Sequence, residues 1–134
     1  MKEISVEVIT PSSAAYTGAA GSVTIPGTSG GFQVLYNHAP LMSTFDVGIV
    51  KVEETSGDTK IFATGGGTVE VRNNKVLLLA ESFEAPEKID AERAEEAKDR
   101  ALERLAHRSK PDIDEVRAEF ALKRAINRLK VINL

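Results

Sequence analysis

Four arginines are the residues of this sequence that are best suited to bind a ligand. Arg93 and Arg100 are seven positions apart, which places them on one side of a helix. Arg124 and Arg128 are four positions apart and share a side in the same way. A guanidinium group can hold phosphate oxygens through two parallel N–H bonds. If the two segments pair as antiparallel helices, the arginines can converge near Asp90 and clamp a polyphosphate. Otherwise they are ordinary surface arginines, paired within their own helices.

The sequence gives little support for catalysis or for a bound metal ion. Its only histidines are His38, in an expected loop, and His107, which we expect to complement the dipole at a helix end. Neither is placed as a base beside a nucleophile. Glu81, Glu84 and Glu87 have no accompanying histidine, so we expect a solvated linker there rather than metal ligands. The chain has no cysteine, which excludes a disulfide framework and a cysteine zinc site. We therefore predict a non-catalytic protein that holds no metal.

The arginines lie on two alanine-rich stretches, residues 89–106 and 112–134. Apolar residues recur there at intervals of three and four, which predicts two helices, each with one apolar face. A short connection that contains a proline predicts an antiparallel hairpin. Asp90 is expected to cap the first helix and Asp112, with Glu115, the second. The predicted seam consists of Ala91, Ala94, Ala97, Ala101, Leu102 and Leu105 on the first helix and Ala118, Ala121, Leu122, Ala125, Leu129 and Ile132 on the second.

A seam made mostly of alanine is expected to be tight but weak. An alanine methyl removes less apolar surface from water than a leucine side chain does, and each Å² contributes only ~25 cal/mol. Residues 84–134 also carry 12 acidic and 12 basic side chains, which keep the helices soluble when they separate. We therefore predict that the hairpin opens and closes, and that a ligand bound only to the closed form shifts the balance.

The residues before the helices have the composition of a β-structure. Short segments of alternating apolar and polar residues follow one another, separated by turns rich in Gly, Pro and Asn. All ten glycines fall between Gly18 and Gly67. This pattern predicts eight or more strands in an all-β sandwich or flattened barrel. The chain is therefore expected to be α+β, with an antiparallel β-sandwich over residues 1–84 and a helical hairpin over residues 85–134.

Charge and hydropathy argue against two further classes of protein. The net charge of −3 does not suit nucleic-acid binding, which needs a basic face or stripe. The longest apolar run, Val76–Ala80, is far shorter than the ~20 residues of a membrane span. The N-terminus runs straight into a strand pattern without an apolar signal region. We therefore expect a soluble protein that can dock on a membrane complex.

Five motifs, taken in order, resemble the epsilon subunit of bacterial and chloroplast rotary ATP synthases. They are residues 37–41 (NHAPL), 66–71 (GGTVEV), 76–81 (VLLLAE), 89–94 (IDAERA) and 121–129 (ALKRAINRL). The resemblance implies a sandwich of about ten strands that binds the gamma subunit and rests on the membrane c-ring. It also implies a hairpin that lies folded on the sandwich or extends along gamma into the catalytic head of alpha and beta subunits, where it blocks ATP hydrolysis. The implied location is peripheral, on the cytoplasmic face of the bacterial plasma membrane, or on the stromal face of the thylakoid in a plastid.

The resemblance also implies a regulatory ligand. In some bacterial members of the family, ATP binds the folded hairpin and favours the non-inhibitory state, and no cofactor is required. The residues that match the family's nucleotide motif and its further contacts are Glu84, Ile89, Asp90, Arg93, Ala94, Arg100, Arg124 and Arg128. The alternative is a purely structural stalk coupler that binds no nucleotide.

The loop expected to face the rotor departs from the family's pattern. Gly31, Gln33 and Tyr36 stand where the family usually has an acidic residue, a second glycine and a proline. The departure argues against a charge contact with the c-ring at Gly31. His38 is kept, and the resemblance implies that it contacts the stalk. The alternative is a plain turn histidine.

Overall fold

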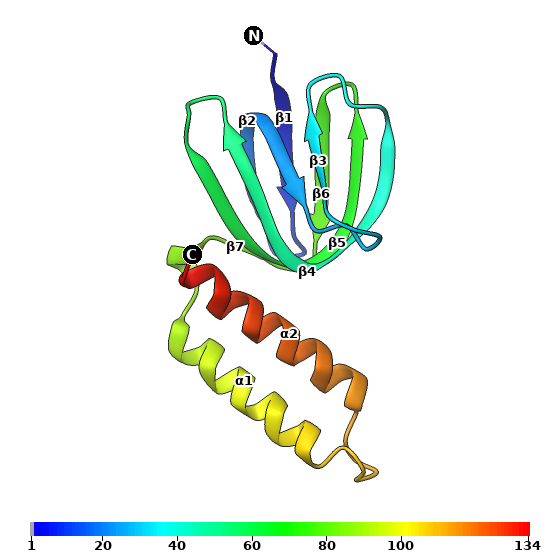
Figure 1. Cartoon of the computed structure of the whole chain (residues 1–134), viewed down its shortest axis with the longest axis vertical. Coiled ribbons are helices and arrows are strands. Elements are labelled where there is room, and N and C mark those ends of the chain that lie inside the picture. The colour runs from blue at the N-terminus through cyan, green and yellow to red at the C-terminus, as the bar shows by residue number, and fades with distance from the viewer. Residues whose placement is uncertain (1) are drawn as a thin grey trace. The chain divides into compact units, whose positions relative to one another are not determined.

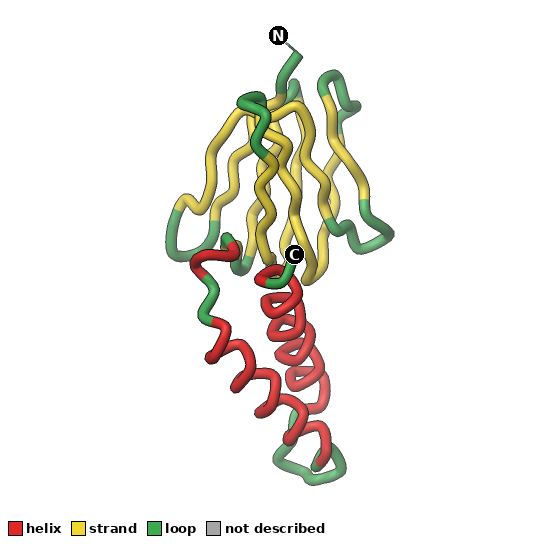
Figure 2. Tube along the Cα trace, turned by 60° about the vertical axis from the view of Figure 1, so that its left-hand side comes forward, coloured by secondary structure: helices red, strands yellow, loops and turns green. Residues whose placement is uncertain are grey.

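The computed structural model describes residues 2–134, and the chain divides into two compact units. The first ends at Ala85 and consists of strands, whereas the second, Pro86–Leu134, consists of helices (Figure 1; strands yellow and helices red in Figure 2). The α+β prediction is confirmed: strands come first and two α-helices follow. The boundary expected after residue 84 lies one residue before the division between the units.

Seven strands make up the first unit. They are β1 (Ile4–Ile9), β2 (Ala14–Ile25), β3 (Phe32–Leu35), β4 (Leu41–Glu54), β5 (Thr59–Arg72), β6 (Lys75–Ala80) and β7 (Phe83–Glu84). The strand order is β1-β6-β5-β4-β2-β3, β1 also pairs with β2, and β7 pairs with β5. All pairings are antiparallel except that of β1 with β6, which is parallel.

The alternating pattern predicts eight or more strands and the resemblance implies about ten, whereas the described residues form seven strands, three of them long. The strand β2 pairs with β1 up to Ala20 and with β3 from Ser22 onward. The ladder between β4 and β5 is interrupted at Asp46 and Gly66, where both strands bend. Gly66 has a φ of 96°, a conformation that glycine adopts without strain. Because β2, β4 and β5 each continue through such an irregularity, the sandwich has fewer and longer strands than expected.

The core of the sandwich is built from alternate positions of the strands. On β1 the side chains of Ile4, Val6 and Val8 are at most 1% exposed, and on β6 Val76 and Leu78 are equally buried. The residues between them face outward, as the period of two requires. β-Branched residues dominate this core because their stiff side chains pack well on a pleated surface.

An aromatic stack extends this core. The ring centroids of Phe62 and Phe83 lie 4.4 Å apart, and those of Tyr16 and Phe62 lie 5.2 Å apart. The Tyr16 hydroxyl donates a hydrogen bond to the carboxylate of Glu54. Burial is the main cause that raises the pKa of Tyr16, and the hydrogen bond and charge of Glu54 raise it further. The phenol therefore stays protonated and remains a donor.

The second unit begins with a single 3-10 turn, η1 (Pro86–Lys88), followed by α1 (Ala91–Ala106) and α2 (Glu115–Ile132). Asp90 caps α1 as predicted, because its Oδ1 accepts a hydrogen bond of 3.1 Å from the Arg93 amide. The prediction that Asp112 caps the second helix is wrong. Asp114 is the cap and accepts a hydrogen bond of 3.0 Å from the Arg117 amide.

The reason for this difference lies in the connection between the helices. The amide of Ile113 donates to the carbonyl of Lys110 at 3.1 Å, so a further turn is formed before α2 begins. Asp112 and Asp114 have the same capping chemistry, and only this turn decides between them. As a result α2 starts at Glu115.

The seam of the hairpin is rich in alanine, as predicted. Ala94 and Ala101 of α1 and Ala118 and Ala125 of α2 are at most 3% exposed. The predicted seam was too wide, however. Ala91 is exposed, and Leu102 is 45% exposed.

The positions of these two residues on α1 explain their exposure. Successive residues of a helix are turned by about 100°, so Leu102 lies about 100° from the buried Ala101. Ala91 lies three residues before Ala94, about 60° to the same side of the seam. The helix α2 therefore does not cover either residue.

Candidate functional site

The four predicted arginines lie on one face of the hairpin. Arg93 and Arg100 each precede a buried alanine of α1 by one residue, and Arg124 precedes the buried Ala125 of α2 in the same way. Each is therefore turned by about 100° from the seam in the same sense. In an antiparallel pair, equal turns from the seam bring residues of both helices to the same side. Arg128, three residues after Ala125, is turned to that side by about 60°. These four residues are called the arginine face below.

The antiparallel direction also sets the order of the arginines along the hairpin. The helix α2 returns to contact η1, so its last turns lie beside the beginning of α1. Arg128 is consequently near the level of Arg93. Along the helix axes, Arg93 and Arg100 are ~10 Å apart, and Arg124 and Arg128 are ~6 Å apart, at 1.5 Å per residue. This spacing suits an elongated anion that lies across both helices.

Ion pairs do not neutralise most of the arginine face. Within residues 2–134 no carboxylate oxygen lies within 4.0 Å of the guanidinium groups of Arg93, Arg100 or Arg124. Arg93 and Arg100 are exposed, whereas Arg124 and Arg128 are half-buried. The alternative in which the arginines are paired within their own helices therefore does not hold for the first three. Unpaired guanidinium groups on one face favour a negatively charged ligand.

The other residues of the predicted nucleotide motif have different environments. Ile89 is half-buried, and its amide donates to the carbonyl of Pro86 at 3.2 Å. Asp90 already accepts the capping hydrogen bond, and Ala94 is only 3% exposed within the seam. Glu84 belongs to the first unit, where it is half-buried at the end of β7. Ala94 therefore supports close packing of the helices, and Asp90 fixes the start of α1.

His38 lies in the loop between β3 and β4. Its Nδ1 is 2.7 Å from the carbonyl oxygen of Ala39, and its amide donates to the carbonyl of Leu35 at 3.2 Å. The preceding Asn37 has a φ of 65°, and its amide donates to Oδ1 of Asn74 at 2.7 Å. These bonds tie the loop to the turn between β5 and β6. The ring of His38 is half-buried, and these hydrogen bonds hold the loop that carries it in place.

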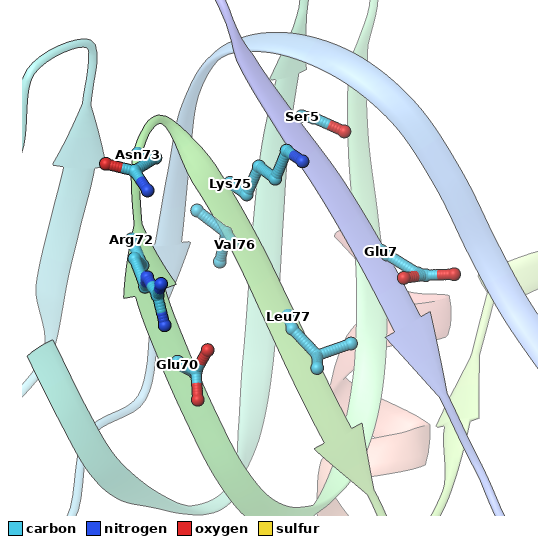
Figure 3. Close-up of a pocket in the computed structure, with 8 residues that line it drawn as sticks. All are labelled: Ser5, Glu7, Glu70, Arg72, Asn73, Lys75, Val76 and Leu77. Atoms are coloured by element: carbon cyan, nitrogen blue, oxygen red, sulfur yellow. The ribbon is translucent and has the colours of Figure 1, made fainter. Parts of the chain in front are cut away.

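A surface that the sequence alone did not reveal lies on the outer side of the sheet formed by β1, β6, β5 and β4. A cavity of about 360 Å³ lies on this surface, and Figure 3 shows the residues that line it. The register aligns Arg72 with Lys75 in one row of the sheet, and Glu70 with Leu77 and Glu7 in the next. The cavity is lined by Ser5, Glu7, Glu70, Arg72, Asn73, Lys75, Val76 and Leu77.

Exposed apolar side chains continue this surface. Met42 is paired with Glu70, and Leu79 is paired with Ile9 across the parallel ladder. Met42 is 77% exposed, Leu79 48% and Ile9 37%. Together with the half-buried Leu77 they are called the outer sheet face below. The run Val76–Ala80 could have indicated the outer sheet face from the sequence, because a strand that is apolar at every position has an apolar outer side as well as an inner one.

Within residues 2–134 no helix is long and apolar enough to cross a membrane. The same residues contain no group of three or more His, Cys, Asp or Glu side chains that could hold a metal ion.

Comparison with known proteins gives matches over nearly the whole chain. The family model "ATP synthase, Delta/Epsilon chain, beta-sandwich domain" matches residues 3–86, and "ATP synthase, Delta/Epsilon chain, long alpha-helix domain" matches residues 87–133. The ATP synthase epsilon chain of Bacillus pumilus is 40% identical over 131 residues, and that of Bacillus licheniformis is 42% identical over 131 residues. Each of these alignments covers 98% of both chains.

Solved structures share the fold. A chain of the mitochondrial ATP synthase of Euglena gracilis, in a structure of its OSCP, F1 and c-ring parts, aligns with a TM-score of 0.79 and 21% identity. That alignment covers 92% of this chain and 77% of the Euglena chain. A chain from the central stalk and c-ring of the Tetrahymena thermophila mitochondrial ATP synthase aligns with a TM-score of 0.55 and 16% identity, over 97% of this chain and 93% of that one.

Proposed function

The chain belongs to the delta/epsilon family of ATP synthase subunits, which are non-catalytic, and we propose that its hairpin regulates ATP hydrolysis while its sandwich joins the central stalk to the rotor. One observation carries the regulatory part of this proposal. Three guanidinium groups without a carboxylate partner lie on one face of a hairpin whose seam is made of alanine. A ligand that lies across this face contacts both helices only when they are together.

The proposed ligand is ATP, with its phosphates on the arginine face. Arg93 and Arg100 come from α1, and Arg124 and Arg128 come from α2. A phosphate chain held by both pairs stabilises the closed hairpin and has no equivalent site on separated helices. At a hundredfold excess over its Kd such a ligand contributes ~2.7 kcal/mol to the closed form. That is enough to reverse a balance of one or two kcal/mol.

The alanine seam makes such a small balance reasonable. A buried CH₂ or methyl group contributes ~0.8 kcal/mol, so an alanine contributes much less than a leucine at the same place. Ala94, Ala101, Ala118 and Ala125 fill the centre of the seam. In the open form, Lys123, Arg124, Arg128 and Lys130 would be available to acidic surfaces of the alpha and beta subunits in the catalytic head. ATP and the head would then compete for overlapping arginines.

The outer sheet face is the proposed docking surface for the gamma subunit. Leu79 and Ile9 are paired neighbours, and Met42 lies on the same face, separated from Leu77 by Glu70. All are exposed to solvent to some degree, at a cost in exposed apolar area unless a partner covers them. Charged side chains of Arg72 and Lys75 border the face and would orient the partner. Exposed apolar side chains bordered by charged ones are typical of protein–protein interfaces.

The c-ring contact is proposed at the loop that contains His38. Leu35 is 50% exposed and Tyr36 41% exposed, in the stretch where the family's acidic residue and proline are absent. This contact would therefore rest on apolar and aromatic groups rather than on a charge at Gly31. The subunit would sit peripherally on the cytoplasmic face of the membrane, and it would need no cofactor.

Calorimetric titration with ATP tests the regulatory part of the proposal. Binding should be measured for the unchanged chain and for Arg93→Ala and Arg128→Ala, one from each helix. Lys123→Ala is the matched control, because it removes a positive charge from α2 away from the arginine face. We expect both arginine variants to lose about tenfold or more in affinity, since each loses hydrogen bonds to a charged group. Equal binding by all four proteins would contradict the clamp.

Deleting residues 86–134 in the assembled synthase separates the regulator from the structural coupler. A regulator loses its inhibition of ATP hydrolysis on deletion, whereas a coupler keeps the same hydrolysis rate. Assembly of the stalk should survive in both cases, because the sandwich forms a compact unit of its own.

A further inference from the structure

A second cavity lies within the helical unit, at the end of α1 that leads into the connection. Its volume is about 320 Å³, and it is lined by Arg100, Glu103, Arg104, His107 and Ile113. Arg100, Glu103 and Arg104 are at positions i, i+3 and i+4 and therefore share a face of α1, and His107 is the C-cap residue that follows the helix. Ile113 comes from the turn before α2 and is half-buried. The cavity thus has an apolar side and a charged side.

The charged side of this cavity has two guanidinium groups that are available to a ligand. Within residues 2–134 neither Arg100 nor Arg104 has a carboxylate within 4.0 Å. The neighbouring Arg108 is different, because its Nη1 is 3.6 Å from the carboxylate of Glu115 and its Nε donates to the carbonyl of Leu105 at 2.8 Å. Arg108 therefore stabilises the connection between α1 and α2. The guanidinium groups of Arg100 and Arg104 remain available to bind another anion.

Three features oppose an anion here. Glu103 lines the cavity and subtracts one charge from the two guanidinium groups. The end of α1 carries a partial negative charge of about one half. Asp112 and Asp114 flank Ile113, although the Asp114 carboxylate already accepts the capping hydrogen bond of α2. Among the residues that line the cavity, two guanidinium groups against one carboxylate leave a net positive charge.

We propose that this cavity is a phosphate-binding subsite, in which Arg100 and Arg104 hold a phosphoryl oxyanion beside His107 and Ile113. Paired guanidinium groups suit such an oxyanion because each can offer two parallel N–H bonds. The site lies towards the end of α1, whereas the nucleotide clamp extends from Arg93 at its beginning. Arg104 belongs only to the subsite, so the two can be separated by mutation. Inorganic phosphate and the terminal phosphates of a nucleotide share the chemistry that this site recognises.

Amide NMR spectra of the full chain during titration with inorganic phosphate test the subsite. Sodium chloride at equal ionic strength is the reference for unspecific salt effects. We expect saturable shifts of the His107 and Ile113 amides with phosphate and not with chloride. Arg104→Ala should weaken this binding about tenfold, and Lys123→Ala, which removes a charge elsewhere on the hairpin, should leave it unchanged. Equal dissociation constants for Arg104→Ala and the unchanged chain would overturn the subsite.

Glu103→Gln provides a test in the opposite direction. It removes the carboxylate from the cavity wall, so phosphate should bind about threefold more tightly. Unchanged or weaker binding would show that the anion does not sit in this cavity and would overturn the proposal. Because this variant gains binding, a folding defect cannot imitate the expected result.

A parallel titration with ATP distinguishes the source of the phosphate and separates this proposal from the nucleotide clamp. If ATP shifts the Ile113 amide and Arg104→Ala removes that shift, the subsite takes a nucleotide phosphate. If only inorganic phosphate does so, the subsite takes the free anion. Both results support the subsite, whereas the absence of an Ile113 shift with either ligand overturns it. The clamp is tested independently by Arg93→Ala, which leaves Arg104 in place.

Discussion

Replacing Ala101 by leucine should open the hairpin without touching the arginine face. Ala101 is 1% exposed in the seam, and leucine adds three carbon atoms where α2 already fills the space. Inserting such groups into a packed site costs about 1–3 kcal/mol. If the whole cost falls on the pairing of the helices, the equilibrium between closed and open forms moves by about 5- to 150-fold. The sandwich should not change, because it is a separate compact unit.

Hydrogen exchange of individual amides in the full chain measures this shift. We expect the amides of Ala94 and Ala118 to exchange faster in Ala101→Leu by about the same factor, since their protection depends on local opening. Ala106→Leu is the matched control, because it makes the same replacement at an exposed position of α1. ATP should restore part of the protection in Ala101→Leu if it binds the closed form. Exchange rates within twofold of the unchanged chain at both amides would refute the reasoning that the seam is held weakly.

Three further predictions concern the hairpin cap and the sandwich. Asp114→Ala should destabilise the helical unit by about 1 kcal/mol and Asp112→Ala should not, as thermal melts followed by circular dichroism will show; equal effects would contradict the cap assignment. Met42→Glu should leave the melting of the sandwich unchanged but weaken binding to isolated gamma subunit by tenfold or more, and equal binding would argue against the outer sheet face. Gly67→Ala should unfold or strongly destabilise the sandwich, because the new methyl group would collide with the carbonyl oxygen of Leu79; a denaturant midpoint equal to that of the unchanged chain would contradict this.

Local patterns in the sequence were enough to predict the two kinds of structure and their order. The alternation of Ile4, Val6 and Val8 indicated a strand, and the spacing of Ala94 and Ala101 indicated a helix face. Both periods depend on residues a few positions apart, so a single sequence contains them. The α+β fold follows from these periods together.

Other features could not be predicted in the same way. The choice of Asp114 over Asp112 as cap depends on the turn that Ile113 forms with Lys110, because both aspartates have the same capping chemistry. The exposure of Leu102 depends on which side of α1 the second helix contacts. The same holds for the seven continuous strands, because only their pairing reveals that three of them continue past a bend.

The candidate site was predicted in part. The spacing of Arg93 and Arg100 indicated one side of a helix, and the hairpin adds that Arg124 and Arg128 lie on the same face. The sequence could not reveal that three of these arginines have no carboxylate partner, because ion pairs depend on side-chain positions. The outer sheet face was missed because its residues, among them Met42, come from strands far apart in the sequence and meet only through the sheet register.

The distance between the two helices inside the assembled synthase tests the central claim most directly. The chain has no cysteine, so Glu92→Cys and Lys130→Cys, both at exposed positions, introduce two spin labels at the open end of the hairpin and nowhere else in this subunit. Pulsed electron paramagnetic resonance should give a short and a long distance between the two labels without ATP, and mainly the short distance with ATP. A single short distance under both conditions would contradict a hairpin that opens, and a distribution that ATP leaves unchanged would contradict its control by nucleotide.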